Sequence, residues 1–138
     1  FGRVLVLERV PLSIANFITS ITSNKILILL LINILLLIVG TFMETLAAIV
    51  ILTPILLPIV EKVGVSPLHF GIIMIVNLCI GFITPPLGAN LFMTAQVGKL
   101  KFDELARSIL VWVLVMFLAL MVITYVPIVS TGLVRFMR

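Results

Sequence analysis

Side chains with oxygen donors gather around two short interruptions in otherwise apolar sequence. The interruptions read VGTFMET at residues 39–45 and GFITPPLG at residues 81–88. Where a helix stops, its last carbonyls carry partial negative charge, and where the next begins, its first amides carry partial positive charge. Carbonyls and threonine hydroxyls together make a hard oxygen cage that suits Na⁺, whereas helix N-termini suit a carboxylate. The pattern predicts that a cation and an organic anion bind side by side, as in a cation-coupled carrier.

The residues expected to form these sites lie at the interruptions themselves. The predicted Na⁺ set is Gly40, Thr41, Gly81, Thr84 and Pro85, and the predicted substrate-binding set is Thr45, Gly88 and Asn90. Any one of the polar residues could instead make a helix-packing hydrogen bond, which is the commoner role of Ser, Thr and Asn in membranes. Their clustering around both interruptions favours the binding role. Further oxygen donors within the apolar stretches are Asn33, Glu44, Thr53, Asn77, Thr94 and Gln96.

Glu44 is an ionisable residue between two apolar runs. Such a residue is functional by default when it lies deep in a membrane. At the start of a helix, however, a carboxylate can simply complement the helix dipole. We favour the capping role for Glu44.

The sequence offers no arrangement suited to catalysis. It has one histidine, His69, and one cysteine, Cys79, and its adjacent carboxylates Asp103 and Glu104 are better explained as charges in the first turn of a helix. Clusters of N or S donors for a transition metal are absent from the sequence. We therefore expect a protein that is not an enzyme.

Composition identifies the class of protein. Of 138 residues, 63% are hydrophobic and 10% charged, with mean hydropathy +1.45. A soluble domain has about 25% charged residues, and a membrane span needs roughly 20 apolar residues. The net charge of +4 comes from single cations that mostly flank the apolar runs, as anchors of membrane segments do. A soluble enzyme, a nucleic-acid binder and a disordered tail are excluded, and the partner expected throughout is the lipid bilayer.

Charged residues divide the first half of the chain into two segments. Residues 1–23 are expected to hold the end of a membrane helix followed by an amphipathic helix that begins at Pro11 and lies in the interface. Within 24–66, apolar runs of 18 and 16 residues flank the first interruption. Each run is short for a span, so the residues alone allow two short spans joined by a turn or a re-entrant hairpin.

The run that follows, assigned to 67–100, contains its own break. Ser66 is the expected N-cap of a helix that starts at Pro67, and His69 in its first turn is expected at the interface. Pro85 and Pro86 cannot donate backbone hydrogen bonds, so a continuous helix would orphan the carbonyls of Gly81 and Phe82. An unwound segment is therefore predicted, which makes 67–100 a discontinuous helix.

Residues 101–138 are expected to form a connecting helix and a final membrane span. The apolar stretch 108–134 is long enough to cross the bilayer, with Trp112 and Tyr125 as interface anchors. Pro127 is expected to end its regular part.

The stretches GTFMETLAAIVILTPILLPI and GVSPLHFGIIMIVNLCIGFITPPLGANLF closely resemble the C-terminal part of the large membrane subunit of TRAP (tripartite ATP-independent periplasmic) transporters. The resemblance implies an all-α integral membrane fold: a re-entrant hairpin, a discontinuous transmembrane helix and scaffold helices, forming one half of an inverted-repeat, elevator-type carrier. It implies Na⁺-driven import of carboxylates such as sialic acids or C4-dicarboxylates. Family members are longer, so the chain matches about their last third.

The same resemblance implies the partners. These are a small membrane subunit, a periplasmic substrate-binding protein and the N-terminal part of the large subunit, in the bacterial inner membrane. It also assigns 11–23 to an arm helix and 108–134 to the scaffold. Two other classes stay open, namely a different elevator-type Na⁺/anion symporter and a non-transporting membrane scaffold subunit. An inverted second copy of the pattern upstream would favour a carrier.

Overall fold

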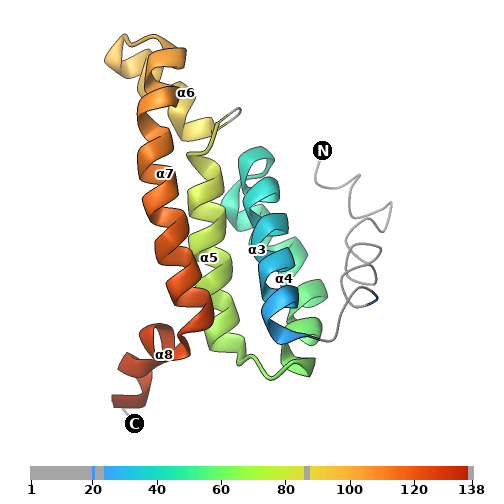
Figure 1. Cartoon of the computed structure of the whole chain (residues 1–138). Helices are drawn as coiled ribbons and strands as arrows, with labels where there is room; N and C mark the ends of the chain where they lie inside the picture. The colour runs from blue at the N-terminus through green and yellow to red at the C-terminus, as the bar shows by residue number, and fades with distance from the viewer. Residues whose placement is uncertain (1–19, 21–23, 86–87, 137–138) are drawn as a thin grey trace.

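The computed structural model describes residue 20 and the ranges 24–85 and 88–136, and its regular elements there are all α-helices. The helices named below are α3 (Lys25–Phe42), α4 (Thr45–Lys62), α5 (Pro67–Phe82), α6 (Ala89–Gly98), α7 (Phe102–Tyr125) and α8 (Pro127–Phe136) (Figure 1). Three of them, α3, α4 and α7, are long and apolar enough to cross a membrane. The predicted all-helical class is confirmed, and these helices fit an integral membrane protein. The elements predicted within 1–23 lie, apart from Ser20, outside the described residues.

Helices α3 and α4 form an antiparallel hairpin whose start and tip are capped by side chains. The Asn24 side chain accepts the N–H of Ile26 at the start of α3. Helix α3 ends at Phe42, and Glu44 caps the start of α4. Buried Ile28, Ile32 and other apolar residues of α3 pack in one core with α4 and α5.

Residues 83–88 separate α5 from α6, at the position of the predicted break. The Ser66 side chain accepts the N–H of His69 at the start of α5, and Pro67 occupies the first turn, as predicted. The N–H of Gly88 donates to the Thr84 carbonyl, and Gly88 adopts a φ of +20°, which a residue with a Cβ rarely takes.

The last part of the chain differs from the expected single span over 108–134. Helix α7 already begins at Phe102, with Asp103 and Glu104 in its first turn, and it ends at Tyr125. Proline has no N–H and disfavours a helical conformation in the residue before it, so the helix stops there and Pro127 opens α8. The prediction that Pro127 ends the regular helix is confirmed, and α7 begins before residue 108, the predicted start of the span.

The hairpin tip lies at the level of the break between α5 and α6 (Figure 1). Helix α6 continues beyond that level, and α7 runs alongside both α5 and α6. The first and second interruptions of the sequence are therefore neighbours in space.

Candidate functional site

The two interruptions meet where the backbones of α3 and α5 touch, at Gly40 and Gly81. A Cβ atom on Gly81 would lie 2.7 Å from the Leu37 carbonyl oxygen and 2.8 Å from the Cα of Gly40. A Cβ atom on Gly40 would lie 3.0 Å from the Leu78 carbonyl oxygen. Only glycine allows backbones to approach so closely, because any side chain would fill the gap. These glycines therefore fix the hairpin tip against the end of α5.

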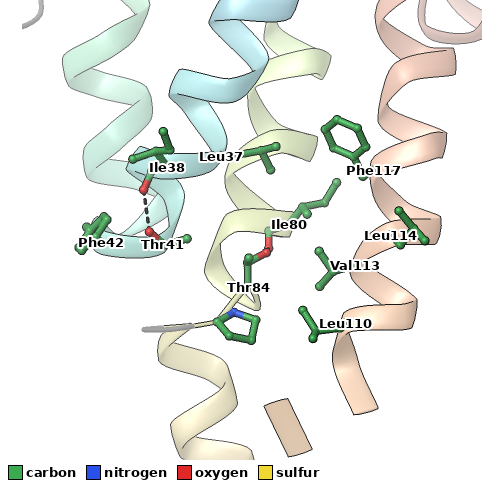
Figure 2. Close-up of a pocket in the computed structure, with 11 residues that line it drawn as sticks. Leu37, Ile38, Thr41, Phe42, Ile80, Thr84, Leu110, Val113, Leu114 and Phe117 are labelled. Atoms are coloured by element: carbon green, nitrogen blue, oxygen red, sulfur yellow. Dashed lines mark hydrogen bonds between the residues drawn. The ribbon is translucent and has the colours of Figure 1, made fainter. Parts of the chain in front are cut away.

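A cavity of about 530 Å³ opens between α3, α5 and α7 at this end of the bundle. Three members of the predicted Na⁺ set line it, namely Thr41, Thr84 and Pro85. Figure 2 shows Thr41 on one wall and Thr84 on the neighbouring wall, opposite the apolar face of α7. The remaining lining residues are Leu37, Ile38, Phe42, Ile80, Leu110, Val113, Leu114 and Phe117.

Both threonine hydroxyls donate their protons to carbonyls of the preceding helical turn. Thr41 Oγ1 donates to the Ile38 carbonyl at 2.7 Å, and Thr84 Oγ1 donates to the Ile80 carbonyl at 2.6 Å (Figure 2). A hydroxyl whose proton is engaged in this way keeps its lone pairs free as acceptors. The two side chains can therefore offer oxygen ligands to a cation, but they have no proton left for an anion.

The paired prolines predict that the Gly81 carbonyl lacks a backbone hydrogen bond, but it has one. It accepts the N–H of Thr84 at 2.9 Å, because the chain tightens into a turn as α5 ends. The backbone N–H of Ile83, the C-cap of α5, also bonds to this carbonyl, so the turn itself uses the acceptor positions of the Gly81 oxygen. The predicted Na⁺ set is thus gathered at one place, with the glycines serving a packing role that the sequence analysis missed.

The predicted substrate-binding residues Thr45, Gly88 and Asn90 do not line the cavity. They lie at the first turns of α4 and α6, and these two helix starts differ. At α4, the Glu44 carboxylate accepts the N–H groups of Leu46 and Ala47, each at 3.1 Å. At α6, none of the described side chains caps the first turn. Among the described residues, the start of α4 therefore holds a carboxylate, whereas the start of α6 does not.

A sequence profile of the family described as "Tripartite ATP-independent periplasmic transporter, DctM component" matches residues 1–129. The chain belongs to this family. It is 58% identical to an isethionate TRAP transporter permease protein, DctMQ, of Oleidesulfovibrio alaskensis over 92% of its length. It is 44% identical over 96% of its length to the C4-dicarboxylate large permease DctM of Pseudomonas aeruginosa, and 39% over 92% to the sialic acid large permease SiaM of Vibrio cholerae.

These TRAP permease relatives are much longer than the chain. It covers 20% of the isethionate permease, 31% of the C4-dicarboxylate permease and 30% of the sialic acid permease. The chain thus holds a fraction of the residues that a whole permease of this family has.

The capping role of Glu44 in this TRAP permease chain leads to a specific expectation. Glu44→Gln keeps one acceptor oxygen for the start of α4, so the cap is weakened by about 1 kcal/mol or less. We expect the full-length variant to retain most of its Na⁺-dependent uptake, measured with radiolabelled substrate in vesicles. Complete loss of uptake at normal protein levels would instead make Glu44 a coupling residue.

A second polar cluster of the permease chain, away from the cavity, joins α3, α5 and α7. Asn77 donates from Nδ2 to the Oδ1 of Asn33, and Asn33 donates from its own Nδ2 to Thr124 Oγ1 at 3.0 Å. The His69 Nε2 lies 3.1 Å from the Thr124 carbonyl oxygen, and its Nδ1 pairs with the hydroxyl of Ser130. From the sequence, the asparagines are only separate oxygen donors, because nothing in the sequence pairs them with Thr124.

His69 was expected at the membrane interface, but its side chain is only 3% exposed. From its place on α5, the His69 side chain contacts the end of α7 and the start of α8. These partners, Thr124 and Ser130, lie on either side of the helix end at Pro127. The position of His69 in the first turn of α5 could not predict them, because they are far away in the sequence.

Proposed function

We propose that the chain is the C-terminal part of the large permease subunit of a sodium-coupled TRAP transporter. The transporter imports organic acids such as sialic acid or C4-dicarboxylates across the bacterial inner membrane. A periplasmic binding protein delivers the substrate, and a small membrane subunit and the N-terminal part of the large subunit complete the assembly. The names of the relatives support the substrate class. The contact between Gly40 and Gly81 carries the coupling proposal, because it brings both interruptions to one place.

The cation half of the proposed site consists of the hydroxyl oxygens of Thr41 and Thr84. The two hydroxyls line one cavity, and their protons are already engaged within their own helices. Neutral oxygen ligands of this kind suit Na⁺ better than a transition metal. The apolar walls leave the ion's shell incomplete, so we assign the remaining ligands to the missing part of the subunit.

The anion half of the proposed site belongs to the start of α6. Helix N-termini bind carboxylates through their free N–H groups and their positive dipole end. The described side chains provide no cap for the first turn of α6, and Asn90 there is exposed. The carboxylate of Glu44 at the start of α4 would repel a substrate carboxylate, so Thr45 is the weaker candidate of the predicted set.

The level of the hairpin tip supports the re-entrant arrangement over two complete spans. The tip ends beside the break, while α6 and the first turns of α7 continue farther in the same direction (Figure 1). If α7 spans the bilayer, the tip of α3 and α4 stops within the membrane. That is where a carrier of this class is expected to place its ion and substrate.

The buried cluster of Asn33, Asn77, Thr124 and His69 favours placing α7 in the same moving body as the hairpin. The family resemblance assigns 108–134 to the fixed scaffold. A surface that slides during transport should be smooth and apolar, because each buried hydrogen bond across it must break in every cycle. The proposal therefore has α7 move together with α3 and α5.

A cross-link between α3 and α7 tests that part of the proposal. In a cysteine-free full-length permease, Asn33→Cys and Thr124→Cys place two thiols where the native side chains share a hydrogen bond. We expect cross-linking to leave uptake at the level of the same double variant before oxidation. Uptake that falls on oxidation and returns with a reductant would restore the scaffold assignment.

The sodium site is tested by Thr41→Val and Thr84→Val in the full-length transporter. Valine keeps the shape and removes the oxygen, so the Na⁺ concentration for half-maximal uptake should rise roughly tenfold for each variant, which corresponds to about 1.4 kcal/mol. The rate at saturating Na⁺ should change less. Thr53→Val is the matched control, since its hydroxyl makes the same bond to the Ile49 carbonyl but does not line the cavity. An unchanged Na⁺ dependence in both test variants would remove these side chains from the site.

A further inference from the structure

The buried histidine of the second polar cluster lies where three helices meet. His69 is in the first turn of α5, and α8 packs against both α5 and α7 (Figure 1). The Nε2 atom of His69 lies 3.1 Å from the carbonyl oxygen of Thr124 on α7, and Nδ1 pairs with the hydroxyl of Ser130 on α8. The two ring nitrogens therefore contact two different helices.

The partners of the ring determine where its protons can be. A carbonyl oxygen only accepts hydrogen bonds, so Nε2 carries a proton when it bonds to Thr124. The Ser130 hydroxyl has one proton, which it donates to the Pro127 carbonyl oxygen at 3.0 Å. A hydroxyl that donates to Pro127 can only accept from Nδ1. The three contacts together therefore require a proton on each ring nitrogen, and His69 is then positively charged.

A neutral His69 needs a different arrangement of protons. Its Nδ1 then has a lone pair and no proton, so Ser130 must turn its hydroxyl proton from the Pro127 carbonyl to the ring. The Pro127 carbonyl keeps the hydroxyl of Thr131, which donates to it at 2.8 Å. Both charge states can thus be hydrogen-bonded, but only the charged ring is linked through Ser130 to the backbone of α8.

A cavity of about 400 Å³ reaches His69 from the end of the bundle. The other titratable side chains among its described lining residues are Lys25 and Tyr125. Lys25 starts α3 and Tyr125 ends α7, and both helices are long and apolar enough to cross a membrane. The cavity therefore lies where the membrane surface is expected, so protons can reach the ring from water.

Two interactions of the ring become stronger when it is charged. The Thr124 carbonyl belongs to the last turn of α7, where the negative end of the helix dipole attracts a cation. Hydrogen bonds from a charged donor are also roughly twice as strong as neutral ones. Lys25 repels a charged ring, but it is exposed and its Nζ lies 3.4 Å from the Gly64 carbonyl oxygen, so water and salt screen it. The described side chains of α8 carry no charge, and Glu61 and Lys62 at the end of α4 do not line the cavity.

We propose that His69 is a pH-sensitive latch, which ties α8 to the ends of α5 and α7 when the ring takes up a proton. Histidine is the side chain that ordinarily changes charge between about pH 5 and 8. In acid, the ring donates to both Thr124 and Ser130, and α8 is held in one orientation. At alkaline pH the bond to Ser130 is neutral and weaker, so α8 varies more in its angle to α7. This inference concerns the junction of the three helices and does not rest on the sodium site.

The distance between spin labels in the complete transporter tests the latch. In a cysteine-free permease, one nitroxide is placed on Trp112→Cys of α7 and the other on Val129→Cys of α8, since both positions are exposed. The part of α7 between Trp112 and its end is roughly 20 Å long, which suits pulsed electron paramagnetic resonance. We expect the distance distribution to be roughly half as wide at about pH 5.5 as at about pH 8.

Three variants separate the histidine from other titrating groups. His69→Gln has one donor and one acceptor at every pH, as neutral histidine has, so the distribution should stay wide at both pH values. Ser130→Ala removes the partner on α8 and should have the same effect. Ser108→Ala is the matched control, because the Ser108 hydroxyl donates to the Glu104 carbonyl at 2.9 Å within α7 itself. It should respond to pH as the wild type does.

An equal width at both pH values in the protein with His69 intact would overturn the proposal. The same narrowing in His69→Gln or Ser130→Ala would also overturn it, because another group would then cause the change. The first comparison needs no substitution at the latch, so it holds even where a variant fails to assemble. Na⁺-dependent uptake is measured on the same samples, which separates a failure of the latch from a failure of the proposed function.

Discussion

Gly81→Ala should strongly destabilise the full-length permease and abolish its Na⁺-dependent uptake. The new Cβ would lie 2.7 Å from the Leu37 carbonyl oxygen and 2.8 Å from the Gly40 backbone. Backbone atoms cannot turn away as a side chain does, so α3 and α5 must separate. Overpacking costs about 1–3 kcal/mol in general, and we expect at least the upper end here. The measurements are the Tm of the purified transporter and uptake in vesicles.

Gly71→Ala is the matched control for this prediction. Gly71 lies on the same helix, and a Cβ there would meet no atom within 4 Å. Alanine is favoured over glycine inside a helix by roughly 0.5–1 kcal/mol, so Tm should stay the same or rise. If Gly81→Ala and Gly71→Ala give the same Tm and the same uptake, the close contact between the hairpin tip and α5 does not exist in the working protein.

Replacing Pro85 and Pro86 by alanine should abolish the coupling of transport to Na⁺ without lowering the Tm of the protein. Two restored N–H groups could donate to the carbonyls of Gly81 and Phe82, and α5 would continue through the break. Regular helix should form because unpaired polar groups are costly in the membrane. The variant should therefore keep or raise its Tm, yet lose both the Na⁺-induced rise in Tm and transport. Pro86 lies outside the described residues, so its part in the prediction rests on the chemistry of proline.

A proline elsewhere in the hairpin supplies the comparison. Pro54→Ala also restores a backbone N–H in a membrane helix, but Pro54 does not line the cavity. It should keep the Na⁺-induced rise in Tm. Should the variant without Pro85 and Pro86 also keep a wild-type rise, these prolines would be packing residues and the ion would bind elsewhere.

Local chemistry made the element ends predictable from sequence. Ser66 and Pro67 mark the start of α5, the prolines after Thr84 mark the break, and Pro127 marks the end of α7. Each acts through its own backbone or through groups within a few residues, so no tertiary information is needed. The capping role of Glu44 belongs to the same class, since its partners lie two and three residues ahead.

Contacts between distant helices were beyond what the sequence could predict. Gly40 and Gly81 were expected to be carbonyl ligands, and their packing against each other depends on how α3 crosses α5. Asn33 and Thr124 are 91 residues apart, and neither shows which donor it meets. Small and polar residues in apolar helices signal that a contact exists, but the partner follows only from the packed bundle.

In the proposed transporter, the two interruptions share one sodium site built on Thr41 and Thr84. Equilibrium binding of radioactive sodium to the purified full-length transporter tests it most directly. The double variant Thr41→Val/Thr84→Val should lose one saturable sodium site relative to the wild type, while Thr53→Val should keep it. Unchanged sodium affinity and stoichiometry in the double variant would contradict a sodium site on these two threonines.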